Sequence, residues 1–179
     1  MINSRSINDL HLVVANKCLA HIANCKKRGV DVIVTSTLRD DEYQGVLYAQ
    51  GRTTKGAIVT NQSVTGAHGL GLAYDVVPVI NGVAIWADNN LWSIIGEEGK
   101  KLGMAWGGDW ASFVDKPHFE LTDGLEFSQL RSGLRPAWYG VTSLKEYFQI
   151  RTGFENQTIQ FLDAYKFAEP LFTKLSALL

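Results

Sequence analysis

The stretch of sequence that decides the fold is residues 68–82, HGLGLAYDVVPVING. Residues 72–80 within it are apolar and rich in β-branched side chains, which favours a β-strand. The Asn-Gly dipeptide at residues 81–82 strongly favours a two-residue hairpin turn, so residues 83–86 are expected to return as the partner strand. One charged group, Asp75, interrupts the apolar run.

Helical and strand patterns alternate irregularly on either side of this stretch. Helices closed by a glycine are predicted over residues 7–28, 40–50 and 91–102. Short strands are predicted at residues 30–37, which we expect to be buried, and at residues 104–106 and 118–121. The polar, glycine-rich residues 51–70 predict a loop. Without a regular strand–helix–strand repeat, the predicted fold class is α+β, with a small antiparallel sheet flanked by helices.

Composition excludes several classes of protein. The chain has 179 residues, of which 46% are hydrophobic and 20% charged, as in an ordinary globular protein. Lys and Arg total 17 and Asp and Glu total 18, so no charge imbalance indicates nucleic acid or an anionic membrane as a partner. The apolar stretches fall short of the roughly 18 residues of a membrane span, and residues 1–5 do not begin a secretory signal. We expect no stable membrane insertion, and synthesis in the cytoplasm.

The two cysteines, Cys18 and Cys25, do not predict a disulfide or a metal site. They fall on the first predicted helix, about 10 Å apart along its axis, which is too far for a disulfide. Because the sequence has no CxxC pair, a cysteine-based zinc knuckle is excluded. This use of cysteine is typical of a reduced, cytosolic protein.

The histidines and their acidic neighbours are the candidates for chemistry. His11 and His21 fall on the first predicted helix, where a surface position or core packing is the favoured interpretation for both. His68, at the end of the glycine-rich loop, is followed seven residues later by Asp75. A carboxylate in an apolar strand is costly to bury unless it is paired or bound to a metal ion. A strand-edge Asp75 that faces solvent is the alternative, and this segment alone does not decide between them.

A second cluster, DKPHFE, occupies residues 115–120. Its first residue, Asp115, precedes a proline that restrains the path to His118, and His118 and Glu120 share one strand face. Two histidines and one carboxylate from separate strands are the ligand set of a catalytic zinc site with an open fourth position. Such a metal activates water and polarises a carbonyl, and a nearby carboxylate can take the proton. The residues fit an amide-hydrolysing zinc site.

Residues 66–75, GAHGLGLAYD, together with residues 115–120, resemble the metal motif of the M15 family of zinc peptidases, S-x-H-x-x-G-x-A-x-D followed later by H. The likeness covers roughly residues 4–122 and is strongest to the L-alanyl-D-glutamate endopeptidases of phage endolysins and bacterial cell-wall hydrolases. It also includes residues 36–39 and 106–108, STLR and WGG. One departure is Gly66, which stands where the family usually has Ser.

The resemblance implies a Hedgehog/DD-peptidase-like fold and assigns roles to five residues. One Zn²⁺ ion is expected on three ligands, His68, Asp75 and His118. Asp115 is expected to be the catalytic base. Arg39 is expected to hold the substrate and stabilise the oxyanion, as a fixed cation beside a developing negative charge can do.

Five further side chains near these positions have open roles. Glu120 could orient His118 or contact substrate, or it could be a strand-face acid in a salt bridge. Trp110 is expected to line a cleft, whereas Trp106 and Phe113 are expected to pack in the core. Gln44 could contact substrate one turn beyond the cleft, but an exposed polar group on a helix is the favoured interpretation.

The resemblance implies a peptidoglycan hydrolase that cleaves the L-Ala–D-Glu bond of the stem peptide. A phage endolysin of this kind is made in the bacterial cytoplasm and acts on the cell wall after release through a separate, holin-type pore. One alternative within the family is a D-Ala–D-Ala carboxypeptidase or dipeptidase. An alternative of another class is a non-catalytic murein-binding or virion structural module that keeps zinc for stability.

The predicted boundary between the catalytic domain, residues 1–125, and a C-terminal helical segment, residues 126–179, follows the end of the resemblance. Helices are predicted over residues 142–150 and 156–178, and Ser143 and Glu146 have the spacing of a capping box at the start of the first of them. The segment could be a clasp on the catalytic domain, a wall-binding or membrane-active appendage, or a dimer contact. Its nearly balanced charge weakens a cationic membrane-active role. The sequence does not give the oligomeric state.

Overall fold

The computed structural model describes residues 1–152. The helix predicted over residues 156–178 lies outside these described residues. The chain divides into two compact units, Met1–Pro136 and Ala137–Leu179, and each is considered by itself. The division falls at Pro136, where the composition of the sequence shifts.

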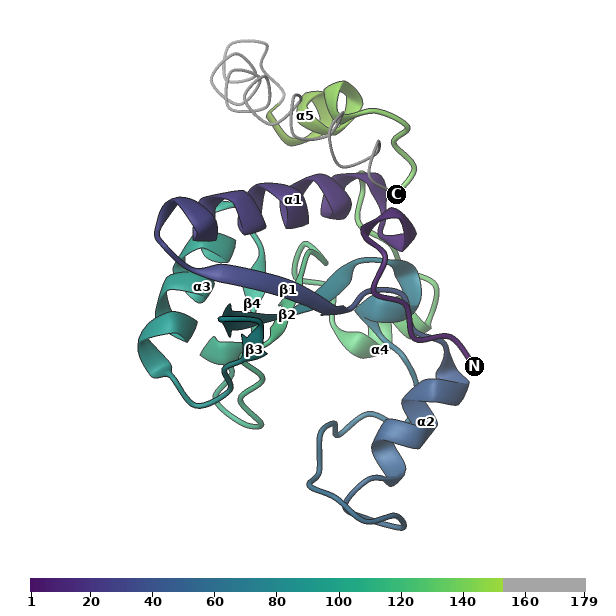
Figure 1. Ribbon diagram of the computed structural model, residues 1–179. Coiled ribbons are helices and arrows are strands. Elements are labelled where there is room, and N and C mark those ends of the chain that lie inside the picture. The colour runs from purple at the N-terminus through teal and green to yellow at the C-terminus, as the bar shows by residue number, and fades with distance from the viewer. Residues whose placement is uncertain (153–179) are drawn as a thin grey trace. The chain divides into compact units, whose positions relative to one another are not determined.

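The first unit is built on a five-stranded antiparallel sheet (Figure 1). Its strands are β1 (Asp31–Ser36), β2 (Ala73–Ile80), β3 (Val83–Ala84), β4 (Ala105–Trp106) and β5 (His118–Glu120). The strand order is β1-β2-β5-β4, with β3 paired to the far end of β2. The predicted α+β class with a small antiparallel sheet is confirmed.

The predicted hairpin after β2 is present. Asn81 and Gly82 both have positive φ, 51° and 78°, as a type I′ turn requires. The returning strand β3 is shorter than predicted, with two residues. The turn fixes the register of β2, and β2 carries one of the candidate metal ligands.

The strand predicted at residues 30–37 is present as β1, but the prediction that it is buried is wrong. β1 pairs with β2 alone among the described strands, and its residues alternate in exposure, with Ile33 51% exposed. The strand lies at the edge of the sheet, and helix α1 (Leu12–Lys27) contacts it (Figure 1). A β-branched run is compatible with either an edge or a central strand, so the sequence did not distinguish them.

The first predicted helix begins later than expected. A short 3-10 helix, η1 (Ile7–Asp9), comes first, and Leu10 is extended before α1 starts at Leu12. His11 is therefore the residue that caps α1, and its Nδ1 accepts a hydrogen bond from the Val13 amide at 3.3 Å. His11 also donates its own amide to the Gly71 carbonyl at 2.9 Å, which ties the helix start to the turn before β2.

The remaining helices of the first unit are α2 (Asp41–Ala49), α3 (Asn89–Lys101) and the short α4 (Phe127–Arg131), with 3-10 turns η2 (Ala67–Leu70) and η3 (Gly107–Asp109). Two of these helices, α2 and α3, follow the predicted positions closely, whereas α4 and the two 3-10 turns were not predicted. Side chains begin two of them: Asp40 accepts from the Tyr43 amide at 2.8 Å, and Asp88 accepts from the Asn90 amide at 2.9 Å. Side-chain acceptors of this kind satisfy amides that have no partner within the helix.

The core lies between α1, α3 and the sheet. His21 on α1 is fully buried there, with its ring nitrogens 3.0 Å from the Tyr74 hydroxyl and 2.8 Å from the Ile95 carbonyl oxygen. Its interpretation as a packing residue is confirmed. Cys18 and Cys25 are also buried and form no disulfide, as the sequence predicted.

The second unit contains helix α5 (Leu144–Thr152), close to the helix predicted at residues 142–150. Half of the expected capping box forms, because the Glu146 amide donates to Ser143 Oγ at 3.3 Å. The Glu146 carboxylate accepts from the Thr142 amide at 2.8 Å rather than from Ser143. Among residues 1–152, every helix is too short or too polar to span a bilayer.

Candidate metal centre and active site

Strand pairing brings two of the predicted ligands together. β2 and β5 are antiparallel, and Asp75 lies directly opposite His118 in their register. Directly opposed residues point their side chains to the same face of a sheet. The third predicted ligand, His68, comes from η2, which precedes β2 and is buried.

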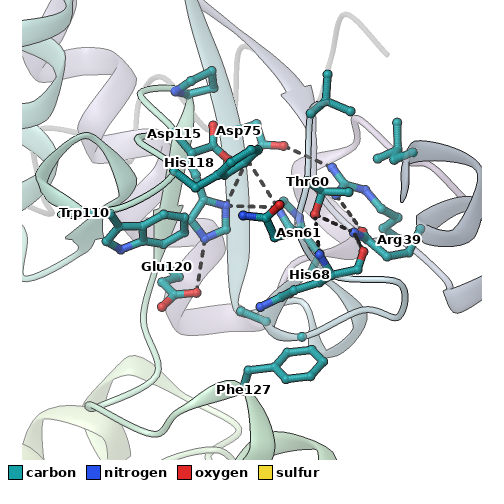
Figure 2. Close-up of a pocket in the computed structure, with 18 of the residues that line it drawn as sticks. Arg39, Thr60, Asn61, His68, Asp75, Trp110, Asp115, His118, Glu120 and Phe127 are labelled. Atoms are coloured by element: carbon teal, nitrogen blue, oxygen red, sulfur yellow. Dashed lines mark hydrogen bonds and ion pairs between the residues drawn. The ribbon is translucent and has the colours of Figure 1, made fainter. Parts of the chain in front are cut away.

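The three side chains converge on one point (Figure 2). His68 Nε2 and His118 Nδ1 are 3.3 Å apart, and each lies 3.2 Å from Asp75 Oδ1. Atoms that bind zinc tetrahedrally at about 2.0–2.1 Å are roughly 3.3–3.4 Å from one another. The triangle of ligand atoms therefore already has the size of three corners of a zinc shell.

Hydrogen bonds fix which nitrogen of each histidine faces the triangle. The other nitrogen of His68, Nδ1, lies 2.7 Å from the Thr37 carbonyl oxygen, and the other nitrogen of His118, Nε2, lies 3.1 Å from Glu120 Oε2. Both partners can only accept, so these nitrogens carry protons, and His68 Nε2 and His118 Nδ1 are the nitrogens left to bind a metal ion beside Asp75. A buried convergence of three acceptors fits a cation, and partners of this kind orient metal ligands.

Electrostatics favour positive charge in the same place. Burial lowers the pKa of His118, but the hydrogen bonds and charges of Asp75 and Glu120 outweigh burial and raise that pKa to about 10. Burial raises the pKa of Asp75, but His68 and His118 together hold it well below its usual range, so Asp75 is ionised. The two carboxylates would stabilise a metal ion at this position for the same reason that they stabilise a proton.

Arg39 lies directly behind the ligand cluster. Its Nη2 donates to Asp75 Oδ2 at 3.1 Å and to Ser36 Oγ at 2.8 Å, while Nη1 donates to Gln44 Oε1 at 3.0 Å. Arg39 thus holds the second oxygen of Asp75 and leaves Oδ1 facing the histidines. Its side chain is 11% exposed and lines the cavity described next.

The expectation that Gln44 is an exposed helix residue is wrong. Gln44 is 3% exposed, because the face of α2 that carries it turns toward the cavity. Besides accepting from Arg39, its Nε2 donates to Thr60 Oγ1 at 3.1 Å and to the Gln62 carbonyl at 2.9 Å. Gln44 therefore links Arg39 to the loop before η2.

The ligand triangle lies in a cavity of about 850 Å³, a volume suited to a peptide segment. Trp110, Asp115, Glu120 and Phe127 line it together with the three predicted ligands. Trp110 is 37% exposed, and its ring centroid lies 5.2 Å from that of His118. Glu120 lines the cavity and also contacts His118 at 3.1 Å, a position compatible with orienting His118 or with contacting substrate.

Asp115 is half-buried on the cavity wall beside the cluster (Figure 2). Its amide donates to the Gly107 carbonyl at 2.9 Å, and its carbonyl accepts from the His118 amide at 3.2 Å. A Cβ on Gly107 would overlap the Asp115 carbonyl oxygen, so glycine is needed for this close approach. Within residues 1–152 the Asp115 carboxylate accepts no hydrogen bond, and burial raises its pKa.

The Gly66 departure from the family motif has a structural explanation. A Cβ added to Gly66 would lie 2.9 Å from Cδ2 of Phe127, which is closer than real side chains approach. The Phe127 ring occupies the space that a serine would need. The spacing of residues in the sequence did not show that Phe127 packs against Gly66. It also did not show that the Thr37 carbonyl contacts His68.

Two aromatic predictions have different outcomes. Trp106 is half-buried, and its ring stacks on the core residue Phe119 at a centroid distance of 6.3 Å, as expected of a packing residue. The prediction that Phe113 packs in the core is wrong. Phe113 is 36% exposed and lines the cavity.

The cavity is also lined by a polar run that was not predicted from the sequence, Thr60, Asn61 and Gln62. These residues fell inside a predicted loop with no assigned role. Three consecutive side chains with hydrogen-bonding groups, a short distance before His68, were the signal that could have identified them.

Comparison with known proteins gives a consistent result. A family model described as D-alanyl-D-alanine carboxypeptidase, an M15 peptidase model, matches residues 60–121. The peptidoglycan L-alanyl-D-glutamate endopeptidase CwlK of Bacillus subtilis is 39% identical over 124 residues, covering 64% of this chain and 74% of the relative. The L-alanyl-D-glutamate peptidase of Listeria phage A118 is 28% identical over 102 residues, covering 53% of this chain and 32% of the relative.

The fold also matches a solved structure. The crystal structure of the L-Ala D-Glu endopeptidase ChiX of Serratia marcescens superposes with a TM-score of 0.50 at 23% identity, covering 68% of this chain and 89% of that one. The fold, the site and the relatives define a peptidase. The chain belongs to the M15 family of zinc peptidases, which confirms the resemblance seen in the sequence.

Proposed function

We propose that the protein is a zinc-dependent peptidoglycan hydrolase that cleaves the L-Ala–D-Glu bond of the stem peptide. The observation that carries the proposal is the buried triangle of His68 Nε2, Asp75 Oδ1 and His118 Nδ1, with edges of 3.2–3.3 Å. The L-alanyl-D-glutamate endopeptidase activity named for the Bacillus subtilis and phage relatives supports the choice of bond.

In this proposal His68, Asp75 and His118 hold one zinc ion. Thr37 and Glu120 keep the two imidazoles in the required orientation, and Arg39 keeps Asp75 in place. When bound, zinc acts as a Lewis acid that polarises a peptide carbonyl and makes water nucleophilic at neutral pH.

Asp115 is proposed to move the proton. Its carboxylate faces the cavity without a hydrogen bond from the described residues, and burial raises its pKa, which suits a general base. Asp115 would accept the proton of the water that attacks the carbonyl carbon. It would then deliver that proton to the nitrogen of the leaving amine, so that hydrolysis ends with a free carboxylate and a free amine.

Arg39 and the aromatic wall are proposed to hold the substrate. The Arg39 guanidinium lines the cavity next to Asp75, and its fixed positive charge favours the oxyanion that develops on the attacked carbonyl. Trp110, exposed beside His118, offers a flat apolar surface for the peptide. Glu120 acts through His118 in this scheme, and Gln44 acts through Arg39.

A second candidate is a D-alanyl-D-alanine carboxypeptidase, which the description of the matching family model favours. Mass spectrometry of purified murein digested by the protein separates the two, with and without a chelator. New L-Ala carboxyl and D-Glu amino ends that vanish with the chelator support the proposal. Released D-Ala supports the second candidate, and fragments unchanged by the chelator contradict the zinc mechanism.

We also propose a biological setting, a phage lysis enzyme made in the bacterial cytoplasm that reaches the wall through a holin-type pore. The phage relative supports this setting. Residues 1–125 would carry the peptidase activity. Expression in a host with and without a co-expressed holin tests the setting. Lysis that is independent of the holin would contradict it.

A further inference from the structure

The polar run Thr60, Asn61 and Gln62 forms part of the cavity wall that faces the ligand cluster. In Figure 2 the Asn61 side chain reaches into this cavity in front of the histidines. Asn61 is exposed, so its amide is accessible to a peptide that enters the cavity.

Arg52 fixes the orientation of the Asn61 amide. Arg52 Nη2 lies 3.1 Å from Asn61 Oδ1, and Arg52 Nη1 donates to the carbonyls of Tyr48 at 2.8 Å and Thr60 at 3.0 Å. The guanidinium also lies 4.0 Å from the centre of the Tyr48 ring. Because an arginine can only donate, the amide atom that faces it must be the oxygen. The NH₂ group of Asn61 is therefore directed away from Arg52.

The same segment is held from the other side by Gln44. Gln44 donates to Thr60 Oγ1 and to the Gln62 carbonyl, and it accepts from Arg39, which in turn donates to Asp75. An unbroken chain of hydrogen bonds thus connects the residues flanking Asn61 to a metal ligand. A donor fixed in this way can position a substrate relative to the metal without losing freedom on binding.

We propose that Asn61 Nδ2 donates a hydrogen bond to a backbone carbonyl oxygen of the stem peptide next to the cleaved bond, and that Arg52 is a positioning residue that acts through Asn61. The proposal rests on the proposed function. A carbonyl is the matching group because the amide is neutral. A carboxylate would call for a cation, and the cation that lines this cavity, Arg39, is already paired with Asp75.

The test measures kcat and KM on purified muropeptides for the zinc-loaded wild type, Asn61→Ala and Asn61→Asp. The aspartate still accepts from Arg52 but has no N–H to donate. Asn61→Asp therefore removes the proposed donor while it keeps the contact that holds the loop. We expect kcat/KM to fall about 3- to 10-fold in both variants, mostly through KM, at unchanged zinc content. Ser63→Ala, an exposed change in the same loop, should behave like the wild type. Wild-type kcat/KM in either Asn61 variant would overturn the proposal.

The role of Arg52 is tested by a double-mutant cycle with Arg52→Met. If Arg52 acts through Asn61, Arg52→Met lowers kcat/KM alone but adds nothing to Asn61→Ala. Additive losses would overturn the positioning role. A wild type that releases no fragment from murein would refute the proposed function itself. If the wild type cleaves murein and the Asn61 variants match its kcat/KM, only the proposed role of Asn61 is refuted.

Discussion

Replacing Glu120 tests how tightly the site holds zinc. Glu120 accepts from His118 Nε2 at 3.1 Å, and its side chain is 24% exposed. A hydrogen bond to a charged group contributes about 1.5–3 kcal/mol and a neutral one about 0.5–1.5 kcal/mol, so the charge contributes about 1 kcal/mol. Glu120→Gln, which keeps an acceptor, should therefore weaken zinc binding about 3- to 10-fold. Glu120→Ala, which also removes the acceptor, should weaken it about 10- to 100-fold.

Zinc affinity is measured by competition with a chromogenic chelator at fixed pH and ionic strength. Glu97→Gln is the matched control, because Glu97 is an exposed acid that pairs with Arg28 on the surface, and it should bind zinc like the wild type. The specific expectation is that Glu120→Ala loses more zinc affinity than Glu120→Gln. Unchanged affinity in Glu120→Ala would refute the role of Glu120 in orienting His118.

Three further predictions concern stability and chemistry. Burial lowers the pKa of His21 in the folded protein. As the pH drops below about 6.5, His21 is therefore protonated in the unfolded chain but not in the folded one, and the free energy of unfolding decreases. Urea titrations of the zinc-loaded protein at pH 7.5 and 5.5 should show a smaller decline in His21→Gln, and equal declines would contradict this reasoning. Gly66→Ser should lower the free energy of unfolding by about 1–3 kcal/mol through its clash with Phe127; in Phe127→Ala the same change should cost less, and strict additivity would exclude the clash. Asp115→Asn should lower kcat at least about 100-fold while zinc content stays constant; retained turnover would exclude it as the base.

Local patterns predicted most of the fold. The hairpin at Asn81 and Gly82 and the helices closed by Gly51 and Gly103 all depend on neighbouring residues, and they appear where predicted. The burial of β1 depends on strand order, which no local pattern contains. The helix start at Leu12 was missed because His11 is an unusual capping residue, and its apolar neighbours continue the helical spacing.

The site was predictable to the extent that its residues lie in short motifs. His68, Asp75 and His118 were singled out because histidines beside acids and a lone acid in an apolar strand are conspicuous, and the resemblance to the M15 motif implied their role as zinc ligands. Gln44 was misjudged because its burial results from a loop folding over α2, some sixteen residues further along the chain. The roles of Thr37 and Gly107 depend on backbone atoms, which a sequence does not distinguish by residue type.

The central claim is that one zinc ion binds to two histidines and an aspartate at the junction of η2, β2 and β5. Anomalous X-ray diffraction from crystals of the zinc-loaded protein, collected on both sides of the zinc absorption edge, tests it most directly. The account predicts a single strong peak in contact with His68 Nε2, Asp75 Oδ1 and His118 Nδ1. A peak at other residues, or these three side chains turned away from one another in the zinc-loaded crystal, would contradict it.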